Sequence, residues 1–85
     1  MLTIKVLGPG CANCERMEQI AQKIVGDLGV EAHIEKITDM NQIIEYGVVT
    51  TPGLMVDDEL VVSGRVPTEA EMAVWIVDGL AAQST

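Results

Sequence analysis

The sequence predicts one small α/β domain, in which a mixed four-stranded sheet carries helices on both faces. Three observations predict this class. The length of 85 residues leaves room for one domain. Short β-branched runs alternate with amphipathic stretches, and the resulting order of elements is β-α-β-α-β-β-α. No internal repeat or linker interrupts this order, so residues 1–85 are expected to form a single domain.

The first half of the chain predicts two parallel strands joined by a helix. Residues 2–7 are apolar and β-branched, and Gly8-Pro9-Gly10 ends this strand. Apolar residues then recur at helical spacing until Gly29, which can act as the C-cap. Residues 30–37 alternate between apolar and polar, as a strand does. A right-handed crossover would connect these two strands.

The second half predicts a short helix followed by a β-hairpin. Thr38 or Asp39 can cap the short helix, and Gly47 ends it. Residues 54–56 and 60–62 are apolar runs separated by an acidic turn, which is typical of an antiparallel hairpin.

A final helix is expected after the hairpin. Thr68 and Glu71 have the spacing of a capping box, which marks its first turn. Trp75 is expected in the core, with its indole N–H at the surface. Residues 81–85 are expected to fray.

The charge of the chain excludes several classes of partner. Thirteen acidic and five basic residues give a formal charge of −8. This balance disfavours binding to nucleic acids and to anionic membranes. The apolar runs are far shorter than the ~20 residues that span a bilayer, and the first residues read as a strand rather than a signal peptide. We therefore expect a cytoplasmic protein with no nucleic-acid or membrane partner.

The only two cysteines, Cys11 and Cys14, form one Cys-x-x-Cys motif. A disulfide closing so small a loop adds little stability, and a disulfide-stapled secreted domain would carry more cysteines. The pair therefore indicates redox chemistry or metal ligation. Cys11 lies between the end of the predicted strand and the start of the predicted helix. The N-terminus of that helix therefore favours the thiolate form of Cys11. We expect Cys11 to attack a substrate and Cys14, one turn further, to resolve the intermediate.

The motif and its βαβ unit resemble the metal site of heavy-metal-associated, copper chaperone-like domains. Such domains hold soft Cu(I) between two thiolates. This resemblance implies a soft-metal or metalloid carrier in which both cysteines are ligands. Two features depart from it: Pro9 stands where that motif has methionine, and the chain inserts a helix after its second strand and ends on a helix.

The second half of the chain resembles the thioredoxin superfamily instead. Residues 50–53, Thr-Thr-Pro-Gly, enter a hairpin that is followed by Gly64, as in the cis-proline hairpin of that superfamily. The order of elements is that of its minimal, glutaredoxin-sized form. The chain resembles the small thioredoxin-like proteins called redox-active disulfide proteins, and this resemblance covers nearly the whole chain.

This second resemblance implies a thiol–disulfide oxidoreductase that reduces protein disulfides. Cys11 and Cys14 would be the redox pair, with Cys11 as nucleophile and no bound cofactor or metal. Pro52 would be the cis-proline beside them, and the backbone of Thr51 would pair with an extended substrate. Gly64 would leave room for the substrate backbone. The expected partners are a disulfide-containing protein and a flavin-dependent, thioredoxin reductase-like electron donor.

The chain also departs from the common thioredoxin pattern. Gly10 replaces the tryptophan of Trp-Cys-Gly-Pro-Cys, and Ala12-Asn13 replaces Gly-Pro, so a thioredoxin redox potential does not carry over. Lys5 stands where thioredoxins have a buried aspartate. It could lie under the active site as a proton relay, or its stem could pack while its ammonium reaches a carboxylate. We favour the second interpretation.

Overall fold

The computed structural model describes residues 2–10, 12–48 and 50–83, and within them the elements follow the predicted order. The strands are β1 (Leu2–Leu7), β2 (Ala32–Ile37), β3 (Gly53–Val56) and β4 (Glu59–Ser63). The helices are α1 (Ala12–Leu28), α2 (Met40–Glu45) and α3 (Glu69–Gln83). None of the helices in the described part of the chain has the length and hydropathy of a membrane span.

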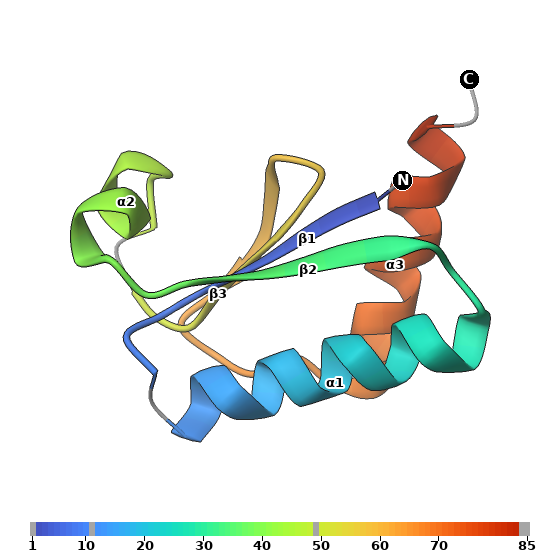
Figure 1. Cartoon of the computed structure of the whole chain (residues 1–85), viewed down its shortest axis with the longest axis horizontal. Coiled ribbons are helices and arrows are strands. Elements are labelled where there is room, and N and C mark those ends of the chain that lie inside the picture. The colour runs from blue at the N-terminus through green and yellow to red at the C-terminus, as the bar shows by residue number, and fades with distance from the viewer. Residues whose placement is uncertain (1, 11, 49, 84–85) are drawn as a thin grey trace.

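The four strands form one mixed sheet in the order β2-β1-β3-β4. Strand β1 pairs in parallel with β2 and antiparallel with β3, and β3 and β4 form the antiparallel hairpin. Helices α1 and α2 lie on opposite sides of this sheet, while α3 packs against α1 (Figure 1). The structure therefore confirms the predicted α/β class, with helices on both faces of a mixed sheet.

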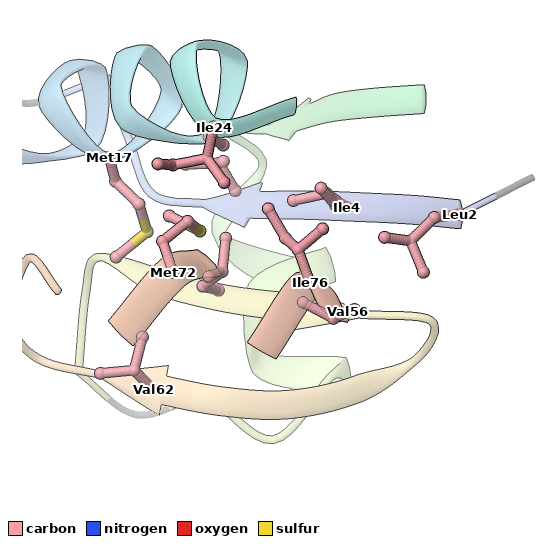
Figure 2. Close-up of a cluster of buried hydrophobic side chains, with 11 residues drawn as sticks. Leu2, Ile4, Met17, Ile24, Val56, Val62, Met72 and Ile76 are labelled. Atoms are coloured by element: carbon pink, nitrogen blue, oxygen red, sulfur yellow. The ribbon is translucent and has the colours of Figure 1, made fainter. Parts of the chain in front are cut away.

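The main core lies between the sheet and helices α1 and α3. Side chains alternate along a strand, so β1 directs Leu2, Ile4 and Val6 toward these helices. There they meet Met17 of α1 and Met72 of α3, and all five residues are fully buried. Figure 2 shows side chains from the strands and both helices converging in this cluster. Packing along this face holds the first turn of α1 at the carboxyl end of β1.

A smaller core lies on the opposite face of the sheet, under α2. Its buried members are Leu7, Ile43, Val48 and Met55. Met40 and Ile44, the other two apolar residues of α2, are exposed. Of the three apolar residues of α2, Ile43 alone is buried against the sheet.

The second strand begins two residues later than predicted, at Ala32. The reason is the end of α1, where Gly29 has a φ of +64°. The N–H groups of Gly29 and Val30 donate back to the carbonyls of Gly26 at 3.3 Å and Val25 at 3.1 Å. This pair of bonds is a Schellman motif. Val30 therefore belongs to the helix cap rather than to the strand.

Side-chain caps begin the other two helices. Asp39 accepts a hydrogen bond of 2.8 Å from the Asn41 N–H, which selects Asp39 over Thr38 as the cap of α2. The capping box at α3 is confirmed, because the Thr68 N–H donates to Glu71 at 3.0 Å and the Glu71 N–H donates to the Thr68 hydroxyl at 3.2 Å. The expected fraying from residue 81 is wrong in part, since α3 continues through Gln83.

Candidate functional site

Cys14 lies in the first turn of α1 and is almost fully buried, with 1% of its surface exposed. Its sulfur lies against the end of β1, because a Cβ placed on Gly8 would overlap the Cys14 Sγ. The Gly8 N–H donates a hydrogen bond of 2.9 Å to the Ile37 carbonyl, which extends the β1–β2 ladder by one residue. The thiol of Cys14 therefore packs directly on the backbone that follows the strand.

The loop before β3 lies beside the same point. The Cα of Pro52 is 3.9 Å from the position that a Cβ on Gly8 would take, and the Thr51–Pro52 peptide bond is cis. Pro52 is buried, Thr51 is half-buried and Thr50 is exposed. The fold thus brings Pro52 together with the start of α1, although α1, β2 and α2 separate them along the chain.

Gly64, directly after β4, joins this loop through the backbone. Its N–H donates a hydrogen bond of 2.9 Å to the Pro52 carbonyl. Its φ is +85°, a conformation that residues with a Cβ rarely adopt. A Cβ here would also lie 2.9 Å from the Thr50 Oγ1. The turn itself therefore requires glycine, and the role of Gly64 in leaving room for a substrate stays a prediction.

An ion pair fixes the segment after Gly64 to the start of α3. The Arg65 guanidinium donates to both carboxylate oxygens of Glu71, at 2.9 and 2.7 Å, which is a bidentate arrangement. Arg65, together with the backbone N–H of Thr68, lowers the pKa of Glu71 to about 2. Both side chains of the pair are exposed, so we expect it to orient this segment more than to stabilise the fold.

Lys5 lies on the face of β1 opposite Ile4 and Val6. Its ammonium donates to Asp58 at 3.1 Å and to the Tyr46 hydroxyl at 3.2 Å, and lies 4.8 Å from the centre of the Tyr46 ring. The hydrogen bond to Tyr46, followed by that to Asp58, raises the pKa of Lys5. Only 14% of the side chain is exposed. The interpretation of a packed stem whose ammonium reaches a carboxylate is therefore confirmed.

The sequence predicts one site containing Cys11, Cys14, Thr51, Pro52 and Gly64. Cys11 lies outside the residues that the structure describes. The segments that carry the other four meet around Gly8 and the Pro52 carbonyl. The cysteine motif, the proline loop and the glycine turn thus form one continuous region of the protein.

Sequence reasoning missed Gly8, which the pattern marks only as part of a strand-breaking segment. One signal was present in the sequence. Pro9 and Gly10 already suffice to end the strand, so Gly8 is not needed as a third strand-breaking residue. A glycine that is not needed to end a strand can indicate a place where another group approaches the backbone closely. In the structure that group is the Cys14 sulfur.

Within residues 2–10, 12–48 and 50–83, no three His, Cys, Asp or Glu side chains gather as a metal site would require. His33, which lies on β2, is paired with Glu35 at 3.3 Å, and both side chains are largely exposed. The alternative of a two-thiolate metal site depends on Cys11 together with Cys14, and Cys11 lies outside the described residues.

Comparison with known proteins gives a consistent result. A family model described as a thioredoxin domain matches residues 2–77. The chain is 46% identical to the thioredoxin of Methanothermobacter thermautotrophicus over 72 residues, which are 85% of this chain and 94% of that protein. It is 39% identical to the thioredoxin of Methanocaldococcus jannaschii over 72 residues, which are 85% of this chain and 83% of that protein.

The fold is also similar to that of a solved structure, thioredoxin-2 of a malaria parasite, described as a component of the parasite's protein secretion machinery. The TM-score is 0.70, and the match covers 92% of this chain and 82% of that one. The sequence identity is 9%, so this likeness concerns the fold alone.

Proposed function

Since the chain belongs to the thioredoxin family, whose members are thiol–disulfide oxidoreductases, we propose that Cys11 and Cys14 form a redox-active pair that reduces disulfides in partner proteins. The Cys11 thiolate attacks one sulfur of the partner disulfide, forms a mixed disulfide and releases the other sulfur as a thiolate. Cys14 loses its proton, attacks the Cys11 sulfur and releases the second partner sulfur. Two electrons pass to the partner, whose thiolates take up the two protons that the cysteines lost, and a Cys11–Cys14 disulfide remains.

The burial of Cys14 beside Pro52 is the observation that carries this proposal. A folded partner cannot bring its disulfide to the sulfur of a residue that is 1% exposed. Cys14 is therefore suited to attack an intermediate already attached at Cys11, three residues earlier in the sequence. Cys11 directly precedes Ala12, the first residue of α1. The N–H groups at a helix start favour a thiolate there, which supports Cys11 as the nucleophile.

Thr51, Pro52 and Gly64 are the proposed substrate-binding residues. Thr51 is half-buried in the loop that adjoins Cys14. An extended segment of the partner can pair with its backbone as an added strand. Gly64 is hydrogen-bonded to the same loop and has no side chain, which leaves space beside the added segment.

The cycle also needs a source of electrons, because each turnover leaves the protein oxidised. We assign this role to a flavin-dependent protein similar to thioredoxin reductase, and we assign no further cofactor to the chain itself. A dithiol that reduces other proteins must stay reduced between turnovers. The reducing cytoplasm is therefore the proposed location.

Reduction of insulin with dithiothreitol as the electron source tests the proposal. The wild-type protein should accelerate insulin precipitation, and Cys11→Ser should abolish the acceleration. Cys14→Ser should also lose turnover but should accumulate a mixed disulfide through Cys11, which mass spectrometry detects under non-reducing conditions. If the two variants trap a peptide disulfide to the same extent, the assignment of nucleophile and resolving cysteine is wrong.

A titration of the reduced protein with Cu(I) against a chelator separates this function from the metal carrier. Tight binding of Cu(I) by the wild type, together with no acceleration of insulin reduction, would favour the carrier. Acceleration that is lost in Cys11→Ser would favour the reductase.

A further inference from the structure

Glycine at position 8 is not explained by its backbone conformation. The described glycines with a positive φ are Gly10, Gly29, Gly47 and Gly64, so Gly8 is not one of them. Its N–H continues the hydrogen bonding of the sheet. Any residue could adopt this backbone without the strain that a left-handed conformation imposes.

A side chain at this position is excluded by Cys14. A Cβ on Gly8 would overlap the Cys14 Sγ and would lie 3.3 Å from the Cys14 Cβ. It would lie 3.9 Å from the Cα of Pro52, which is ordinary van der Waals contact. The conflict is therefore with the thiol of Cys14 and not with the proline loop.

We propose that Gly8 is a positioning residue for the resolving step: its missing side chain creates the space in which the Cys14 sulfur lies. This inference rests on the proposed function, because it takes Cys14 as the resolving cysteine. A methyl group at position 8 must displace either the sulfur or the first turn of α1. The fully buried Met17 and Ala21 hold α1 on the sheet, so the sulfur is the part that moves.

The displacement should affect the second chemical step and not the first. Attack on a disulfide requires the incoming sulfur to approach along the bond that it breaks, and a misplacement of ~1 Å can cost on the order of 100-fold in rate. In Gly8→Ala, Cys14 would approach the mixed disulfide at Cys11 from a displaced position. We expect release of the reduced partner to slow by at least about tenfold, while formation of the mixed disulfide changes by less than about twofold.

Rapid mixing of the reduced protein with a peptide disulfide measures both steps in one turnover, and mass spectrometry of quenched samples counts the mixed disulfide. Gly26→Ala is the matched control, because Gly26 is exposed on α1 and a Cβ there meets no atom within 4 Å. The control should release the partner at the wild-type rate. A folded Gly8→Ala protein that also releases the partner at the wild-type rate would overturn the proposal.

A thermodynamic cycle tests the contact itself, including the case in which Gly8→Ala folds poorly. The loss in Tm caused by Gly8→Ala is measured with Cys14 in place and again in the Cys14→Ala background, where the sulfur is absent. We expect most of the loss to disappear in the second background. An equal loss in both backgrounds would show that the sulfur is not what excludes the side chain. This cycle does not depend on activity, so failure of the wild type to reduce disulfides would count against the proposed function alone.

Discussion

The ammonium of Lys5 lies 3.1 Å from the carboxylate of Asp58, although the two residues are 53 positions apart in the sequence. Asp58 occupies the β3–β4 turn, and its neighbour Asp57 accepts a hydrogen bond of 2.9 Å from the Thr3 N–H. Lys5 also donates to Tyr46, at the end of α2. These contacts join β1, α2 and the hairpin turn across the face of the sheet opposite α1 and α3. The acidic turn thus fastens the hairpin to the first strand.

The first prediction concerns the charge of Asp58. Asp58→Asn should lower the free energy of unfolding by less than about 1 kcal/mol, because the carboxylate is 80% exposed. Asparagine tolerates the φ of +67° found here, so the change removes mainly the charge. The hydrogen bonds to Tyr46 and then to Asp58 raise the pKa of Lys5 above 10.5, so the contribution of Asp58 is fully present below that pH and is lost as pH rises through the folded-state value. Urea unfolding of both proteins at several pH values should show the difference shrinking above pH 10.5. A difference that grows there would contradict the prediction.

The second prediction concerns how the free energy of unfolding falls at acidic pH. Glu71 has a pKa of about 2 in the folded protein, against an ordinary value of 4.5. Its ionised form therefore contributes a small amount of stability above pH 4.5, small because the ion pair is exposed, and this contribution is lost as pH falls through about 2. Glu71→Gln lacks the contribution. Unfolding curves of the two proteins should be separate at neutral pH and converge between pH 4.5 and about 2. Parallel curves over that interval would show that the Arg65–Glu71 pair does not act on stability.

Local chemistry made most element ends predictable from the sequence. Strand β1 ends where predicted because Pro9 and Gly10 follow it closely, and α3 begins where the capping box of Thr68 and Glu71 indicates. The start of β2 could not be predicted in this way. Val30 precedes residues that alternate as a strand does, but its N–H donates to the Val25 carbonyl in the C-terminal cap of α1.

In the candidate site, too, the features carried by a sequence motif could be predicted, whereas those that depend on tertiary packing could not. The resemblance to thioredoxins predicted that Pro52 lies beside the cysteine motif. In the structure Pro52 and Cys14 both lie close to Gly8, and their shared role in a site stays a prediction. The place of the Cys14 sulfur against Gly8 depends on how closely α1 packs on the sheet. That spacing is set by core residues such as Met17, which lie outside the motif.

The third prediction compares two glycines that lie in helices. A Cβ on Gly79 of α3 would lie 2.8 Å from Val56 Cγ1 and 3.0 Å from Leu2 Cδ1, whereas a Cβ on Gly26 of α1 meets nothing within 4 Å. Alanine is favoured over glycine in a helix by roughly 0.5–1 kcal/mol. Gly26→Ala should therefore raise the free energy of unfolding by about that amount. Gly79→Ala should lower it, because overpacking costs roughly 1–3 kcal/mol. Urea unfolding measures both, and stabilisation by Gly79→Ala would contradict the close packing of α3 on the sheet.

The last prediction concerns the reactivity of the two cysteines. In the reduced, folded protein at neutral pH, iodoacetamide should modify Cys11 at least about tenfold faster than Cys14, because a thiolate at a helix start reacts faster than a buried thiol and Cys14 is 1% exposed. Peptide mapping by mass spectrometry gives both rates, and in urea the two should become similar. Lys5→Met should leave the Cys11 rate unchanged, because the Lys5 ammonium is engaged by Asp58 and Tyr46. Equal rates in the folded protein would remove the basis for treating Cys11 as the nucleophile, and a slower Cys11 in Lys5→Met would restore the proton-relay interpretation of that lysine.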